Sequence, residues 1–158
     1  MRNDGVGPFN FELTTDRGRH PVYRIKKSPE KITLRFRVSR NASIYCFSVD
    51  KNLSVVQIFP NMFFNKSNFK NMVKNGEWHN IPDKKWTFNL FAEPPAGKDL
   101  IKCFAATRDI RRDLPRSLRG TSFDPIAGRT AQRLVEIFSK IPRVAISEQS
   151  ILLTTVNE

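Results

Sequence analysis

The sequence is poor in the residues that most often carry catalysis and metal binding. It contains only two histidines and two cysteines. The cysteines lack a C-x-x-C spacing, no cluster resembles a set of metal ligands, and the carboxylates are scattered along the chain. No paired acid and base is indicated either. The sequence therefore predicts no metal ion, no cofactor and no enzymatic activity.

The histidines and cysteines give no signature of nucleophilic catalysis. A cysteine–histidine hydrolase would require His20 or His79 to meet Cys103 in the fold, and nothing local to either histidine favours that arrangement. Cys46 and Cys103 both lie in apolar, strand-like runs. We expect both to be buried free thiols that fill small spaces in the core.

Long apolar runs and negative charge are also scarce. No stretch of 18 apolar residues is present, so no transmembrane segment is expected. The chain has 27 Lys and Arg against 15 Asp and Glu, a formal net charge of +12. Half of this excess lies in residues 102–143. Such a surplus suits nucleic acid, anionic lipid or an acidic protein partner, and it also fits a basic proteome background.

Phenylalanine and a two-residue periodicity are what the sequence has in quantity. There are 13 Phe against 2 Tyr and 2 Trp, and because Phe has no polar group we expect most of them in the core. Alternation is clearest in 31–40, where Ile32 to Val38 predict a buried face while Arg35 and Arg37 point to solvent. The candidate strands before residue 108 are 9–14, 22–25, 31–40, 42–49, 53–59, 84–91 and 100–107.

The pattern changes toward the C-terminus. Apolar residues recur at helical spacing over 124–141, with Asp124 as the expected N-cap and Pro125 at the first helical position. Leu134 and Phe138 should pack this helix on the strands. Segments 143–147 and 150–156 are further strand candidates. The predicted fold is mainly β, an antiparallel β-sandwich of about seven to nine strands with one C-terminal α-helix packed on it.

We expect a single domain over residues 1–158. Its parts are a β-sandwich core at 9–107, a basic connector at 108–123, the helix at 124–141 and C-terminal strands at 142–158. The connector is the best candidate binding segment, since guanidinium groups suit phosphate or carboxylate. A solvated connector without a ligand is the alternative, because no base-stacking aromatic residues accompany the arginines. The candidate binding residues are Arg108, Arg111, Arg112, Arg116 and Arg119.

A second candidate is the Asn- and Lys-rich segment after the strand 53–59. Pro60 suits the exit of an edge strand, and Asn61 can organise a turn through its own backbone. We expect this segment to have mainly a structural role. A small satellite core beneath the loop would be formed by Phe63, Phe64, Phe69 and Trp78. The polar rim of the loop could still recognise a partner. The candidate recognition-loop residues are Asn61, Asn65, Lys66, Asn68 and Lys70.

Several motifs between residues 9 and 107 occur together in one bacterial family. They are the strand from Ile32 to Val38, the hairpin Ser43 to Phe59, the triplet Phe59-Pro60-Asn61, the loop asparagines Asn65 and Asn68, the pairs Gly76-Glu77 and Ile81-Pro82, the turn Pro94-Pro95 with Gly97, and Ala106-Thr107. In this combination the chain resembles the domain of unknown function 4384. The resemblance implies a β-sandwich appended to other modules, often in envelope-associated proteins and sometimes beside protease or kinase domains. It supplies no catalytic residues.

These observations lead to one functional expectation and one alternative. We expect a non-enzymatic interaction or assembly module of a bacterial envelope-associated protein, located in the cell envelope or periplasm. Its partner would be another protein or another domain of a larger assembly. The alternative is a basic, cytoplasmic protein that binds nucleic acid, for which the evidence is charge alone.

Overall fold

The fold is known from a computed structural model, which describes residues 7–25, 29–50, 53–61, 71–82, 90–92, 96–120, 125–126 and 131–157. Most of this structure is β. The elements in chain order are β1 (Phe11–Thr15), β2 (Val22–Arg24), β3 (Lys31–Ile32), β4 (Leu34–Val38), β5 (Ala42–Val49), β6 (Val55–Phe59), β7 (Met72–Val73), β8 (His79–Ile81), β9 (Leu90–Phe91), β10 (Gly97–Ala106), the 3-10 turns η1 (Arg111–Asp113) and η2 (Arg116–Leu118), α1 (Ala131–Ser139) and β11 (Ile146–Val156).

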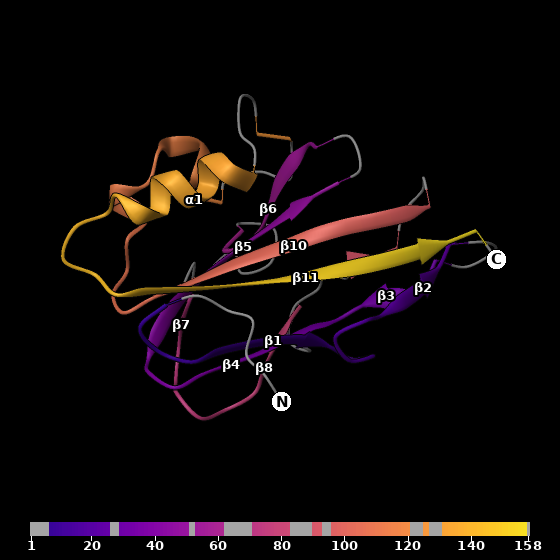
Figure 1. Cartoon of the computed structure of the whole chain (residues 1–158), viewed down its shortest axis with the longest axis horizontal. Helices are drawn as coiled ribbons and strands as arrows, with labels where there is room; N and C mark the ends of the chain where they lie inside the picture. Colours follow the sequence, from indigo (N-terminus) through magenta and orange to yellow (C-terminus); the bar gives the residue numbers. More distant parts are fainter. Residues whose placement is uncertain are drawn as a thin grey trace.

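Two sheets form the body of the molecule. The larger has the order β2-β11-β10-β5-β6, with β7 paired to the end of β5, and the smaller has the order β1-β4-β8. Strands β3 and β9 form a separate pair. Neighbouring strands are antiparallel except β2 and β11, which are parallel. Figure 1 shows the smaller sheet beneath the long strands β10 and β11, with α1 on their opposite side.

The main core lies between the two sheets. Leu34, Phe36 and Val38 of β4 are buried there, as the alternation predicts, and they meet Ile101 and Ile151 of the large sheet. The segment 31–40 is not one strand, however. It is interrupted at Thr33, whose carbonyl accepts a hydrogen bond from Asp16 N, so β3 and β4 belong to different sheets.

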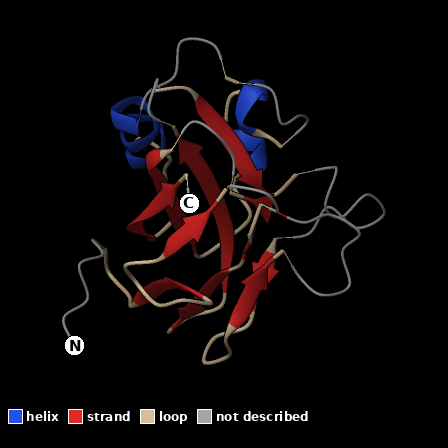
Figure 2. Ribbon diagram, turned by 90° about the vertical axis from the view of Figure 1, so that its right-hand side faces the viewer, coloured by secondary structure: helices blue, strands red, loops and turns tan. Residues whose placement is uncertain are grey.

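A second core lies between the large sheet and α1. Leu134 and Phe138 are buried against it, which confirms that the helix packs on the strands. Figure 2 shows the helical segments as two groups near the same end of the strands. The predicted helix start is wrong: Pro125 and Ile126 are not helical, and Ile126 N donates to Val55 O of β6 instead. Asp124 lies outside the described residues.

The C-terminal segment belongs to the centre of the fold. The two candidates 143–147 and 150–156 merge into one strand, β11, which begins only at Ile146 and pairs with β10 from Ile146–Ala106 to Thr155–Gly97. On its other side β11 pairs with β2. The described residues therefore contain eleven strands, more than the seven to nine expected, because several of them are two- or three-residue pairs without a sequence period.

The prediction of free thiols is wrong. Cys46 of β5 and Cys103 of β10 stand directly opposite each other and form a disulfide, with an S–S distance of 2.10 Å and a Cα–Cα distance of 4.1 Å. Both residues are fully buried. The two cysteines are 57 residues apart in the sequence, and only the register of β5 against β10 brings them together. The sequence pattern therefore did not predict the disulfide.

Candidate functional site

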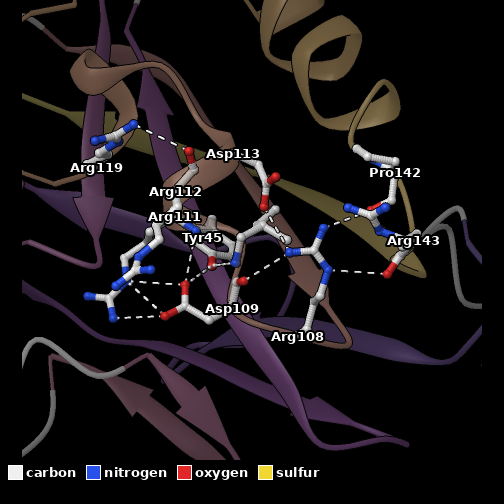
Figure 3. A network of polar contacts seen from close by, with 10 residues as sticks. Tyr45, Arg108, Asp109, Arg111, Arg112, Asp113, Arg119, Pro142 and Arg143 are labelled. Carbon is white, nitrogen blue, oxygen red and sulfur yellow. Dashed lines mark hydrogen bonds and ion pairs between the residues drawn. The ribbon is translucent and has the colours of Figure 1, made fainter.

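The five connector arginines do not converge on one site. Arg108 bridges two parts of the chain (Figure 3): its NH1 donates to Asp113 Oδ2 at 2.8 Å, and its NH2 donates to Pro142 O at 2.7 Å. Its Nε donates to Arg143 O at 3.2 Å. Arg143 has a positive φ of 55°, in the turn between α1 and β11. Arg108 therefore fastens the connector to this turn.

Arg111 belongs to a network built on a buried tyrosine. Its NH2 lies 3.0 Å from Asp109 Oδ2, and the Tyr45 hydroxyl donates to Asp109 Oδ1 at 3.2 Å. The same hydroxyl accepts a hydrogen bond from Ile110 N at 2.9 Å. Figure 3 shows this group at the start of the connector. The network anchors the connector to β5.

Electrostatics in this network favour a charged carboxylate beside a neutral phenol. Burial raises the pKa of Asp109, but the hydrogen bonds and positive charge of Arg111 outweigh that effect and hold the pKa below its ordinary value. Burial raises the pKa of Tyr45 above its ordinary value. Tyr45 therefore stays protonated at neutral pH and donates a hydrogen bond to a charged Asp109.

Of the remaining three arginines, one is braced internally and two are exposed. Arg119 donates from Nε to Leu114 O at 3.1 Å and from NH2 to Arg112 O at 3.4 Å. Arg112 and Arg116 are exposed, and neither side chain has a hydrogen bond or ion pair within the described part of the chain. Among the five connector arginines, only Arg112 and Arg116 are exposed and without a side-chain partner in the described residues.

The ends of the polar loop are fixed by two buried asparagines. Asn61 is fully buried and its Nδ2 donates to Gln57 O at 3.0 Å. Asn71 donates from Nδ2 to Ile44 O at 2.8 Å, while its own carbonyl accepts from Ile44 N at 2.9 Å. Asn61 thus binds back to β6, the strand that precedes the loop. The other loop candidates and the expected satellite-core phenylalanines lie outside the described residues: Asn65, Lys66, Asn68, Lys70, Phe63, Phe64 and Phe69.

The sequence predicts Trp78 in a satellite core, but its side chain is exposed. It is 39% exposed and immediately precedes β8. The guanidinium carbons of Arg37 and Arg35 lie 4.6 Å and 5.0 Å from its ring centroid. Indole has an electron-rich face that attracts cations, so Trp78 contacts the two arginines on the solvent side of β4. We call Arg35, Arg37 and Trp78 the arginine–tryptophan face.

One carboxylate borders the arginine–tryptophan face. Glu12 of β1 stands directly opposite Arg37 of β4, and both of its oxygens lie within 3.0 Å of Arg37 NH2. Arg35 stands opposite Thr14 on one side and Asn80 on the other, and it has no ion pair among the described residues. The face therefore carries one cation paired with a carboxylate and one, Arg35, that is half-buried and has no acid opposite it on either neighbouring strand.

The sequence predicted the two arginines of this face but not its tryptophan. The period of two in 31–40 places Arg35 and Arg37 on the solvent side, as observed. It gave no sign that Trp78 joins them, because that contact depends on the pairing of β4 with β8, some forty residues later in the chain.

The described residues contain neither a cluster of metal ligands nor a membrane-spanning helix. No group of three or more His, Cys, Asp or Glu side chains that could hold a metal ion occurs among the described residues. Within those same ranges, no helix is long and apolar enough to span a membrane.

Comparison with known proteins identifies the family. A family model described as domain of unknown function (DUF4384) matches residues 27–109, just over half of the chain. The matched range runs from β3 through β10. Strands β1, β2 and β11, which complete the two sheets, lie outside it, as does α1. A search of the curated proteins found no match. The chain belongs to the DUF4384 family of domains, as its motifs had indicated.

Proposed function

We propose that the chain is a non-enzymatic interaction module of a bacterial envelope-associated protein and binds another protein or another domain of its assembly. The arginine–tryptophan face is the observation that carries this proposal. Trp78 is exposed and contributes to neither core. Tryptophan and arginine are the residues most enriched among those that dominate binding energy at protein interfaces. Their contact on an outer sheet face supports a role in recognition.

The buried disulfide supports the proposed compartment. Disulfides form and persist in oxidising environments such as the bacterial periplasm and are rare in the reducing cytosol. A bond between Cys46 and Cys103 in the middle of the large sheet fits a chain that folds outside the cytosol.

A comparison of two exposed apolar residues tests the proposed function. Tagged wild-type chain, Trp78→Ala and Leu53→Ala would be incubated with envelope fractions of the source bacterium, and the captured proteins quantified. Leu53 is the matched control, because it is 69% exposed but lies at the turn between β5 and β6. We expect at least one captured protein to be lost with Trp78→Ala and kept with Leu53→Ala. Identical capture by all three chains would contradict the proposal.

Nucleic-acid binding is the second candidate function, favoured by the net charge of +12 and the exposed Arg112 and Arg116. If it is correct, affinity for mixed-sequence DNA or RNA must fall steeply with salt, by about 0.9 in log–log slope for each duplex phosphate contacted. The measurement compares wild type with Arg112→Gln/Arg116→Gln at two salt concentrations. We expect weak binding and a shallow slope. Micromolar or tighter binding near physiological salt that the double substitution abolishes would make nucleic acid the better assignment.

A further inference from the structure

The arginine–tryptophan face has the chemistry to bind carboxylates in series. We propose that it binds an acidic polypeptide segment, one with several Asp or Glu side chains in an extended run. This inference rests on the proposed function and deepens it, because it names the chemical class of the partner. It is argued from the spacing of the two arginines, from the way Trp78 contacts them, and from the carboxylate already present beside Arg37.

The strand positions of the two arginines repeat at the spacing of an extended peptide. Arg35 and Arg37 are two residues apart on β4, so they share one face of the strand. In a strand, side chains on one face repeat at about 6.6 Å, since each residue rises about 3.3 Å. Carboxylates at alternate positions of an extended acidic segment repeat at the same distance. Two acidic side chains at alternate positions of the segment can therefore each meet one guanidinium.

Trp78 makes these guanidinium groups better receptors for carboxylate. Contact with the indole limits the conformations of Arg35 and Arg37, which lie 5.0 Å and 4.6 Å from the ring centroid. Ordering a side chain before the ligand arrives lowers the entropy lost on binding. A planar guanidinium that stacks on a ring still presents its edge, with the paired N–H groups that bind carboxylate. The ring is already in contact with two cations, which makes it a poor platform for stacking a nucleobase.

Glu12 shows what a carboxylate does at this face. Its two oxygens lie 2.9 Å and 3.0 Å from Arg37 NH2 while that arginine remains over Trp78. The side chains of Arg37 and Glu12 are 39% and 43% exposed, so the pair is open to exchange with a ligand from solution. Arg35 has no corresponding acid opposite it, since its strand neighbours are Thr14 and Asn80. A ligand carboxylate would meet Arg35 directly.

The test uses defined probes and charge-matched variants. Binding of a fluorescent octaglutamate peptide is measured by anisotropy at low and physiological salt, beside a neutral peptide of Gln and Ser and an eight-phosphate oligothymidylate. Arg35→Gln/Arg37→Gln is compared with Arg112→Gln/Arg116→Gln, because both remove two exposed or half-exposed positive charges. A third variant, Arg35→Lys/Arg37→Lys, keeps the charge and removes the planar fork. Thermal melts confirm that each variant is folded.

We expect octaglutamate to bind and the neutral peptide not to bind. Arg35→Gln/Arg37→Gln should weaken octaglutamate binding by about tenfold or more, as loss of charge-assisted hydrogen bonds implies. The connector variant should weaken it by about twofold or less, because screening limits the effect of distant charge. The lysine variant should fall between the two.

Three results would overturn the inference: equal losses in the two glutamine variants, no saturable binding of octaglutamate by wild type, or tighter binding of oligothymidylate through Arg35 and Arg37. The proposed function has a separate readout. If octaglutamate fails to bind while Trp78→Ala still abolishes capture of a partner, the acidic ligand is wrong and the interaction module stands. If neither effect is seen, both are wrong.

Discussion

Phe138 of α1 stacks on Phe104 of β10, with ring centroids 4.0 Å apart and planes 2° from parallel. The ring centroids of Phe47 and Tyr45 of β5 lie 6.0 Å and 5.7 Å from that of Phe138. One side chain thus joins the helix to two central strands of the large sheet. Offset or stacked aromatic contacts of this kind add to the gain from apolar burial.

We therefore expect Phe138→Ala to lower the free energy of unfolding by about 3–5 kcal/mol, because it leaves a cavity between helix and sheet. Urea unfolding followed by circular dichroism measures the loss. Gln132→Ala, on the exposed side of the same helix, is the control and should change stability by about 0.5 kcal/mol or less. An unchanged unfolding curve for Phe138→Ala would mean that the helix contributes little to the cooperative fold.

The Cys46–Cys103 disulfide yields the second prediction. Denatured protein without reductant should show no reactive thiol, and reduced denatured protein should show two. Cys46→Ala/Cys103→Ala should lower the free energy of unfolding by about 2–4 kcal/mol, since the bond closes a long loop in the unfolded chain. Reduced wild type serves as the comparison. Two thiols titrating in unreduced, denatured protein would show that the bond does not form.

The sequence predicted those features of the fold that depend on short-range periodicity, namely which side of a strand or helix is buried. Burial of Leu34, Phe36 and Val38 follows from a period of two, and burial of Leu134 and Phe138 follows from helical spacing. Each pattern records which side of an element faces the core. The exposure of Arg35 and Arg37 follows from the same reasoning, so half of the candidate site was accessible from the sequence.

What the sequence did not reveal depends on which strands become neighbours. Cys46 meets Cys103 only in the register of β5 against β10, and Trp78 meets Arg37 only where β8 adds to β4. A period of two tells which face of a strand is buried, but it does not tell which distant strand becomes its neighbour. The connector arginines illustrate the same limit, because Arg108 finds the carbonyl of Pro142 across more than thirty residues. The clustering of charge in the sequence could not distinguish arginines that bind backbone carbonyls, such as Arg108, from the exposed Arg112 and Arg116.

A comparison of Arg108 with Arg112 tests this division. Arg108→Ala should lower the free energy of unfolding by about 1–2 kcal/mol, because it removes hydrogen bonds to Pro142 O and Asp113 Oδ2 that solvent partly screens. Arg112→Ala removes an equal charge from an exposed position and should change stability by about 0.5 kcal/mol or less. Chemical unfolding of both variants measures the difference. Equal losses would mean that the hydrogen bonds of Arg108 add nothing beyond its charge.

The last prediction concerns the open edge of the large sheet, where β2 is the outermost strand. Arg17 donates to Val22 O at 2.7 Å and pairs with Glu30 Oε2 at 2.7 Å. Glu30 in turn accepts a hydrogen bond from Arg24 N at 2.6 Å, and its own amide donates to Arg24 O. Together the two side chains occupy backbone groups that an exposed edge would otherwise offer to another strand.

This arrangement predicts a specific acid sensitivity. The hydrogen bond from Arg17, followed by that from the Arg24 amide, lowers the pKa of Glu30 from 4.5 to about 2. A carboxylate whose pKa is depressed in the folded state binds fewer protons there than in the unfolded chain, so its stabilising effect is complete above about pH 4.5 and is lost as the pH falls toward 2. Wild type should therefore lose stability more steeply over this interval than Glu30→Gln, and the two unfolding curves should converge at the acid end.

In an Arg17→Gln background the same Glu30→Gln substitution should have a much smaller pH-dependent effect, because the principal partner is already gone. A constant offset between wild type and Glu30→Gln from pH 7 to pH 2 would show that this ion pair does not stabilise the edge strand.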